Sequence, residues 1–259
     1  MACFRHNMRH GEQPVYEAFY VNYNEMKIIC LPFAGAGFYS YRPIFAQDPY
    51  FEPLFCALPG RERRYGEPMP GNLYDAAEDL YRQLSGSLSG EYVLWGHSMG
   101  AELARLLLER IQNEGSGLPV HLFVSGRQAP SVDKRNKRYL LPRDQFRDAL
   151  RTLGGVPAEI MENDEVMDFF EPILRSDFKM IETFFEPELT PLSIPVSAMI
   201  GDTDEVDIRE ARPWEQITKG SFDLKIFPGN HFFIFEQASQ LLDYFRQRIR
   251  ETQKTDKPV

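Results

Sequence analysis

The stretch "YVLWGHSMGAELARLLLERI", residues 92–111, decides the fold of this chain. Its first four residues are apolar and rich in β-forming side chains, which predicts a buried strand. Apolar residues then recur at helical spacing, at positions 99, 103, 106, 107 and 111. Between the two segments, Ser98 lies in the pattern G-x-S-x-G with Gly96 and Gly100. In this strand-turn-helix context, Ser98 is predicted to be a nucleophile.

The two glycines explain how such a turn is tolerated. The sharp turn forces the serine into strained backbone geometry, and the absence of side chains at Gly96 and Gly100 removes clashes. The strain exposes the hydroxyl, and the following helix directs its N-terminal amides toward a developing oxyanion. The alternative is that Ser98 is only a polar residue in a glycine-rich turn.

Short apolar runs alternate with helical patterns over most of the chain. Several runs are apolar nearly throughout, as expected of strands covered on both faces of a parallel sheet. The alternation predicts an α/β protein with a mostly parallel, doubly wound sheet. The predicted strands cover residues 26–31, 53–58, 92–95, 120–125, 195–200 and 222–227.

One connection is much longer than the others. Residues 126–192 separate two predicted strands and contain helical patterns at 142–153, 163–174 and 175–185. An insertion of this size predicts a helical cap, or lid, over the carboxyl edge of the sheet, where α/β proteins place their sites. The remaining segments are then an N-terminal extension, a two-part core and a C-terminal tail, over residues 1–25, 26–125 with 193–250, and 251–259.

The composition limits the class of protein. The chain has 259 residues, 43% of them hydrophobic, and a formal net charge of -9. This length suits one sizeable core, and the acidic balance argues against nucleic-acid binding. Three scattered cysteines do not make a disulfide framework. With no signal-peptide core and no apolar run of about 18 residues, we expect a soluble, cytoplasmic protein that does not bind membranes. A monomer is a separate expectation, which these features do not test.

A serine nucleophile needs a histidine base, which should follow it in the chain. His231 lies after the predicted strand at 222–227 and before the final amphipathic helix, so it is the candidate base. Its alternative role is that of a helix-capping surface histidine. The other histidines lie in the N-terminal segment, in a predicted strand or beside Ser98, where packing beneath the turn is expected: His6, His10, His121 and His97.

The base also needs an orienting carboxylate between the serine and the histidine. The segment "AMIGDTDEVD", residues 198–207, offers Asp202, Asp204 and Asp207. The spacing from Gly201 favours Asp204, because it carries this residue past the end of the strand toward the next loop. Asp202 is the alternative, although an aspartate at its position more often pins the turn.

The oxyanion of an acyl-transfer reaction requires two backbone amides. One is predicted to be that of Met99, and the other to come from "LPFAGAG", residues 31–37. The small residues of this loop let the backbone approach a ligand closely, and the sequence leaves Phe33 and Ala34 open as donors. The loop lacks the lysine of a P-loop and the spaced glycines of a dinucleotide site, which argues against a phosphate cradle.

Seven segments together resemble the type II thioesterases that accompany nonribosomal peptide and polyketide synthases. The resemblance spans residues 26–249, and "PGRERR" and "SGRQAP" are not general hydrolase patterns. The segment before Met26 is longer than the family pattern, which leaves its role open. In chain order, the segments are "LPFAGAG", "ALPGRERR", "WGHSMGA", "LFVSGRQAP", "LGGVP", "IGDTDEV" and "GNHFF".

The resemblance implies an α/β-hydrolase fold and an editing enzyme. Family members hydrolyse the thioester between an acyl, aminoacyl or decarboxylated extender unit and the phosphopantetheine arm of a carrier domain, which frees a stalled synthase. Carried over by position, Ser98, Asp204 and His231 form a catalytic triad. The resemblance implies neither a metal nor a bound cofactor, because phosphopantetheine belongs to the substrate. The implied partners are acyl or peptidyl carrier domains.

Surface charges would suit docking to an acidic carrier domain. Arg61 and Arg127 are the candidate carrier-binding residues, and solvated loops are the alternative. In the insertion, Phe178 and Met180 are candidates to line an acyl channel, with packing inside the insertion as the alternative. The basic clusters that suggest docking consist of Arg61, Arg63, Arg64, Arg127, Lys134, Arg135, Lys137 and Arg138.

Two other functions compete with the editing thioesterase. One is another serine hydrolase of the same fold, either a medium-chain fatty acyl carrier thioesterase or a small-molecule esterase or lipase. The other is a non-catalytic binding protein of this fold. The presence of Ser98, Asp204 and His231 together argues against the second, because a decayed site usually loses one of its members.

Overall fold

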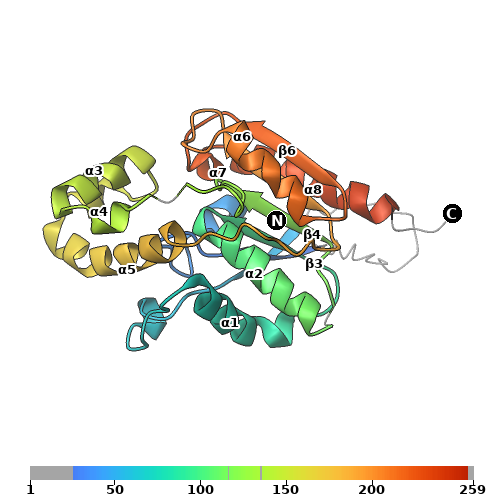
Figure 1. Ribbon diagram of the computed structural model, residues 1–259, viewed down its shortest axis with the longest axis horizontal. Coiled ribbons are helices and arrows are strands. Elements are labelled where there is room, and N and C mark those ends of the chain that lie inside the picture. The colour runs from blue at the N-terminus through green and yellow to red at the C-terminus, as the bar shows by residue number, and fades with distance from the viewer. Residues whose placement is uncertain (1–25, 116, 135, 256–259) are drawn as a thin grey trace, which may run out of the picture.

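A computed structural model describes residues 26–115, 117–134 and 136–255 (Figure 1). Its centre is a six-stranded sheet in the order β2-β1-β3-β4-β5-β6, and every neighbouring pair is parallel. The predicted α/β architecture is therefore confirmed. The strands are β1 Met26–Leu31, β2 Phe51–Phe55, β3 Tyr92–His97, β4 His121–Ser125, β5 Val196–Gly201 and β6 Phe222–Phe227.

Strand β2 begins and ends earlier than the predicted segment 53–58. It is an edge strand, paired only with β1 among the described residues. Pro53 lies inside it, which an edge strand tolerates because the missing N–H is not needed for a second neighbour. The run from Cys56 to Leu58 is buried but belongs to the loop that follows, so its apolar character reflects core packing rather than a strand.

The sheet is covered on both faces by long helices. Helices α1 Leu73–Leu84 and α2 Met99–Asn113 cover one face, and α8 Ala238–Thr255 covers the other (Figure 1). Short helical segments occur in the connections: α6 Ile208–Ala211, α7 Phe233–Glu236 and 3-10 turns at Arg42–Phe45, Glu62–Arg64, Ser85–Ser87, Arg138–Leu140 and Arg212–Ile217.

The two covering layers explain why the four inner strands are apolar nearly throughout. Along β1, Ile29 packs into the core beneath α1 and α2, whereas Ile28 packs into the core beneath α8. Successive side chains of a strand point to opposite faces, so a strand in the middle of this sandwich needs apolar residues at every position. On the α8 side, Trp95 packs against Phe245 with ring centroids 5.2 Å apart.

Between β4 and β5 the chain forms three helices that lie together at one end of the molecule (Figure 1). They are α3 Arg143–Leu153, α4 Ala158–Met161 and α5 Asp164–Glu182. Helix α3 agrees with the predicted pattern at 142–153. The expectation of separate helical stretches at 163–174 and 175–185 is wrong, because α5 continues through Pro172 and ends at Glu182.

Tertiary packing accounts for the continuity of α5. Leu174 and Phe178, which follow Pro172, pack against Phe146 and Leu150 of α3 in one cluster. Proline inside a helix removes one hydrogen bond and disfavours the helix. A continuous apolar face on α5 offsets this cost, because packing rather than intrinsic propensity supplies most helical stability in a folded protein.

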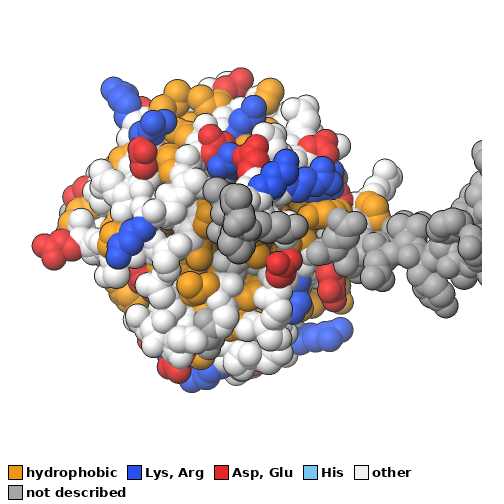
Figure 2. Space-filling model, turned by 90° about the vertical axis from the view of Figure 1, so that its right-hand side faces the viewer, with side chains coloured by type: hydrophobic (Ala, Val, Ile, Leu, Met, Phe, Trp, Pro, Cys, Tyr) orange, Lys and Arg blue, Asp and Glu red, His pale blue; other side chains and the backbone are white. Residues whose placement is uncertain are grey.

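The ends of the chain differ in how far they are described. Helix α8 extends to Thr255, so the segment 251–259 that was expected to be a tail begins as helix. The expected extension, residues 1–25, lies outside the described residues, as do residues 256–259. Within the described part of the chain, no helix combines the length and apolar character that a bilayer span requires. On the face opposite the insertion, acidic and basic side chains lie interspersed (Figure 2).

Candidate active site

Ser98 lies at the sharp turn between β3 and α2. Its φ of 54 is positive, a conformation that non-glycine residues rarely adopt and that stores strain. The Ser98 amide donates to the Ser125 carbonyl at 2.7 Å, which ties the turn to β4. A Cβ at Gly96 would lie 1.9 Å from the Gly100 carbonyl oxygen, and one at Gly100 would lie 2.3 Å from that of Leu31. The geometry therefore requires glycine at both positions.

His231 and Asp204 meet at the carboxyl edge of the sheet. Asp204 follows β5 and His231 follows β6, and His231 Nδ1 lies 2.9 Å from Asp204 Oδ1. The two side chains are 5% and 0% exposed, respectively. With Nδ1–H donating to the carboxylate, Nε2 keeps its lone pair. Nε2 is buried and has no hydrogen-bond partner within the described residues.

The three aspartates of the segment 198–207 have different contacts. Asp202 is exposed and accepts a hydrogen bond from the Gly229 amide at 2.9 Å, so it pins the turn after β5. Asp207 caps the N-terminus of α6 and pairs with Arg209 at 2.7 Å. Asp204 is the member of the three whose carboxylate contacts the imidazole of His231.

Ser98 and His231 line one small cavity of about 40 Å³, beneath the insertion. Phe33 and Ala34 line the same cavity, so the loop expected to supply an oxyanion amide lies beside the serine. Met99, the other expected donor, is fully buried at the first position of α2. The arrangement brings together a hydroxyl, an imidazole lone pair and two segments of backbone amides.

Two larger cavities adjoin this one. The first, of about 920 Å³, is mostly apolar and shares Phe33, Ala34 and Val156 with the small cavity. The second, of about 590 Å³, is lined by more polar residues and shares His231 and Arg138 with the small cavity. A substrate with an apolar chain on one side of its reacting carbonyl and a polar arm on the other would fit this arrangement.

His97 packs beneath the turn, as expected. It is fully buried, and its Nδ1 lies 3.0 Å from Ser125 Oγ. Desolvation, with a smaller effect of the nearby His231, lowers the pKa of His97 well below its usual value, so this ring is neutral at pH 7. The ring centroids of His97 and His231 are 4.9 Å apart. A Cβ at Gly126 would approach the Cε1 atoms of His97 and His231 to 2.4 and 3.1 Å.

The support of His231 by His97 and Gly126 is a feature that the sequence reasoning missed. The available signal was the glycine in "SGRQAP", since Gly126 has a φ of 61 and leaves no room for a side chain beside the two rings. A glycine directly after a buried strand often marks a close approach of this kind.

Arg61 does not present its charge at the surface, contrary to the expectation of a docking cluster. Its side chain is 3% exposed and forms an ion pair with Asp177 of α5 at 2.7 Å. Asp177 is completely buried, and a buried carboxylate needs a compensating partner, which draws Arg61 inward. Arg64 also has acidic partners, Asp79 and Glu67. The expected basic surface at 61–64 is thereby largely neutralised.

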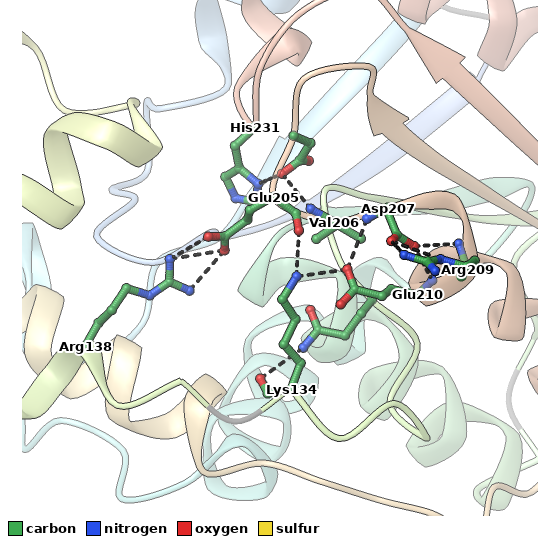
Figure 3. A network of polar contacts seen from close by, with 10 residues as sticks. Lys134, Arg138, Glu205, Val206, Asp207, Arg209, Glu210 and His231 are labelled. Atoms are coloured by element: carbon green, nitrogen blue, oxygen red, sulfur yellow. Dashed lines mark hydrogen bonds and ion pairs between the residues drawn. The ribbon is translucent and has the colours of Figure 1, made fainter.

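The second basic cluster connects the insertion to the loop that carries Asp204 (Figure 3). Lys134 donates to the Glu205 carbonyl at 2.5 Å and to the Glu210 carboxylate at 2.8 Å. Arg138 pairs with Glu205 at 3.0 Å and with Glu182 at 2.6 Å. Arg135 lies outside the described residues. These basic side chains therefore fix the loop beside His231.

The remaining candidates lie in different surroundings. Arg127 lines the small cavity and donates to the Ile181 carbonyl at 3.3 Å. Phe178 also lines the small cavity, while its ring contacts Phe146 with a centroid distance of 5.6 Å. Met180 instead belongs to the main core beneath α1 and α2, so it packs away from the expected channel. Different faces of α5 therefore line the small cavity and pack into the main core.

The described residues contain no group of three or more histidine, cysteine or acidic side chains arranged to hold a metal ion. Both described cysteines, Cys30 and Cys56, are buried and free. Desolvation by burial raises the pKa of each thiol above its usual range, which keeps the thiols protonated. Neither thiol lines the small cavity, whereas Ser98 does, so Ser98 is the nucleophile candidate there.

Comparison with known proteins agrees with the geometry. A model of the thioesterase domain family matches residues 26–249. The gramicidin S biosynthesis protein GrsT of Aneurinibacillus migulanus is 32% identical over 231 residues, 87% of this chain and 90% of that protein. The medium-chain S-acyl fatty acid synthase thioesterase of Rattus norvegicus is 28% identical over 221 residues, 83% of each chain.

A solved structure extends the comparison to the fold. The type II thioesterase BorB from the borrelidin biosynthetic cluster superimposes with a TM-score of 0.79 at 30% identity, covering 92% of this chain and 95% of that chain. The resemblance to type II thioesterases indicated by the seven segments is thus confirmed. The chain belongs to the thioesterase family.

Proposed function

We propose that this protein hydrolyses acyl and aminoacyl thioesters on the phosphopantetheine arm of carrier domains, which removes aberrant or stalled units from a nonribosomal peptide or polyketide synthase. The observation that carries the proposal is the cavity shared by Ser98 and His231, with His231 Nδ1 2.9 Å from Asp204 Oδ1. Two similar proteins support it by their names: GrsT is a gramicidin S biosynthesis protein, and BorB is a type II thioesterase from the borrelidin biosynthetic cluster. Such a role fits a cytoplasmic enzyme that acts as a monomer.

The reaction would proceed through an acyl-enzyme. His231 Nε2 takes the proton of the Ser98 hydroxyl as Oγ attacks the thioester carbonyl. The amide of Met99, with that of Phe33 or Ala34, stabilises the oxyanion of the tetrahedral intermediate. The C–S bond then breaks, and His231 returns the proton to the departing thiol of the arm. Water, deprotonated by His231, then attacks the carbonyl of the acyl-serine. The bond between this carbonyl carbon and Ser98 Oγ breaks, His231 returns the proton to Oγ, and the acid is released.

The three cavities suggest how the substrate lies. The apolar cavity of about 920 Å³ would hold the acyl chain, and the polar cavity of about 590 Å³ would admit the arm. The insertion, residues 126–192, would act as a lid, since its residues line all three cavities. Arg127 and Arg138, which both line the small cavity, are the basic side chains best placed to contact the arm.

Val156 provides a test of this substrate placement. It lines both the small cavity and the apolar cavity and is only half-buried, so a larger side chain can be accommodated without disrupting the core. Val156→Trp is expected to lower kcat/KM for a decanoyl thioester by roughly 10 to 100-fold while leaving an acetyl thioester within a few fold. Equal losses on both substrates would contradict the assignment of the apolar cavity to the acyl chain.

The decisive test of the function compares the carrier with small substrates. We expect an acyl carrier domain to give a higher kcat/KM than the acetyl thioester of N-acetylcysteamine or p-nitrophenyl esters. If free esters are turned over with equal or better specificity constants, the editing function is wrong and a small-molecule esterase is favoured.

The apolar cavity also favours a second candidate function, that of a medium-chain fatty acyl carrier thioesterase. The name of the relative from Rattus norvegicus describes a thioesterase of this class. Strong preference for octanoyl over aminoacyl carriers would support that candidate.

A further inference from the structure

Arg61 and Asp177 form a buried, two-pronged ion pair between the loop after β2 and helix α5. Arg61 Nη1 lies 2.7 Å from Asp177 Oδ2, and Nη2 lies 2.8 Å from Oδ1. The side chains are 3% and 0% exposed. This parallel geometry fixes the orientation of both groups as well as their separation. The pair takes no part in the acyl-transfer steps described above.

The pair also holds the loop that supplies the second oxyanion amide. The Gly35 amide donates to Asp177 Oδ2 at 2.8 Å, and Arg61 Nη1 donates to the Ala36 carbonyl at 3.3 Å. The next residue of the same segment, Glu62, accepts a hydrogen bond from the Phe38 amide at 2.8 Å. Three successive parts of the loop 33–38 are thus bound by side chains from two distant segments.

Helix α5 packs directly against this loop. A Cβ added at Gly35, which has a φ of 77, would come within 2.5 Å of the Leu174 side chain. Leu174, Asp177 and Phe178 are spaced to lie on one face of α5, and Leu174 and Phe178 line the cavity that contains Ser98. The carboxylate of Asp177 therefore reaches the loop from the face of α5 that covers the reacting groups.

Stability alone does not account for this arrangement. Desolvation of two buried charges offsets most of their attraction, so a buried pair contributes little net stability relative to apolar residues of similar size. The arrangement carries further costs, since Arg61 Nε is buried without a hydrogen-bond partner in the described chain, and Glu62 has a strained φ of 48. What the contacts do fix is the position of the backbone between Phe33 and Phe38.

We infer that Asp177, together with Arg61 and Glu62, positions the oxyanion loop, residues 33–38. The position of the insertion then determines the position of the amides that form the oxyanion hole. This inference rests on the proposed function. The amides of Phe33 and Ala34 precede Gly35 directly, and a displacement of about 1 Å at a catalytic group can cost as much as 100-fold in rate. A shift of α5 away from the core would withdraw Asp177 from Gly35 and loosen the hole.

The test removes both charges together. Arg61→Met/Asp177→Leu replaces the pair with apolar side chains, which avoids a lone buried charge. The matched control is Arg246→Met/Asp48→Leu, because Asp48 also pairs with an arginine and accepts a backbone amide, that of Tyr50 at 2.9 Å, on the α8 side of the sheet. Each protein is assayed for hydrolysis of an octanoyl-pantetheine thioester and for binding of two octanoyl analogues, a trifluoromethyl ketone and an amide.

Positioning of the oxyanion loop predicts a selective loss. The double variant should lower kcat by roughly 10 to 100-fold. Its affinity for the trifluoromethyl ketone should fall by a similar factor, because this ketone forms a tetrahedral oxyanion on Ser98. Affinity for the amide, which mimics the ground state, should stay within about 3-fold, as should every value for the control. Glu62→Ala, at an exposed position, should give a smaller loss with the same selectivity, and it provides the test if the double variant fails to fold.

Two results would overturn the inference. One is a folded double variant, or Glu62→Ala, with kcat and ketone affinity within about 3-fold of wild type. The other is an equal loss of ketone and amide affinity, which would mean that these residues shape ground-state binding. If the wild-type protein itself failed to hydrolyse the thioester, the proposed function would fall together with the inference. An active wild type with unaffected variants refutes the positioning role alone.

Discussion

Ser98→Ala is expected to lower kcat for hydrolysis of a carrier-bound thioester about 10⁶-fold, to the background left by binding and the oxyanion amides. The reason is that the strained turn, in which Ser98 has a φ of 54, presents this hydroxyl to the cavity that His231 also lines. Alanine removes that hydroxyl without changing the turn. Single-turnover assays with an octanoyl carrier domain would measure the loss.

Binding should survive this substitution, because the hydroxyl contributes to the reaction and not to the carrier contacts. We expect carrier affinity, measured by calorimetry, to remain within a few fold of wild type, and fluorophosphonate labelling to vanish. Ser193→Ala, at an exposed serine outside the site, is the matched control and should retain full activity. Hydrolysis by Ser98→Ala near the wild-type rate would remove Ser98 from its role and mean that another group is responsible for turnover.

Local sequence signals predicted much of the fold. The run at 26–31 coincides with β1, because a strand covered on both faces leaves a continuous apolar signal that needs no tertiary information. The run at 222–227 coincides with β6, an edge strand in which Asp223 and Lys225 alternate with apolar residues. The helical stripe that begins at Met99 coincides with the start of α2. The signal was weaker where packing overrides local preference, as in α5, where contacts with α3 keep the helix intact through Pro172.

The residues of the candidate site also differ in how well the sequence predicts them. Ser98, Asp204 and His231 could be selected from chain order and from the strand ends that precede them, since the carboxyl ends of parallel strands meet at one edge. The burial of Arg61 could not be predicted, because a basic residue in a loop looks like surface charge until its partner is known. That partner, Asp177, lies far away in the chain and inside a helix whose apolar neighbours hide a buried carboxylate.

The acidic partners of the basic residues explain why the basic clusters are poor evidence for docking. Lys134 and Arg138 carry charge that the acidic loop around Glu205 neutralises, and Arg61 is buried. Net charge and local clusters describe a surface only when the opposing charges that fold against them are known. Contacts with a carrier therefore have to be sought at the rims of the cavities rather than in the sequence clusters.

The second large effect is expected for Asp204→Asn, which should lower kcat about 10⁴-fold. The asparagine amide can donate a hydrogen bond to His231 Nδ1, and the imidazole then carries its proton on Nε2, where it cannot accept the proton of Ser98. Because the substitution is isosteric and the Asp204 side chain is completely buried, the fold should be preserved. Stopped-flow measurement of acyl-enzyme formation would show the loss in the first chemical step.

The neighbouring aspartates provide matched controls for this prediction. Asp202→Asn keeps an oxygen to accept the Gly229 amide, and Asp207→Asn keeps a good N-cap for α6, so both should stay within about 3-fold of wild-type kcat. A loss at Asp202→Asn as large as that at Asp204→Asn would mean that the acid is not fixed by the 2.9 Å contact with His231. If Asp204→Asn alone is impaired, the contact defines the orienting carboxylate, and the tautomer of His231 becomes the property on which thioester cleavage depends.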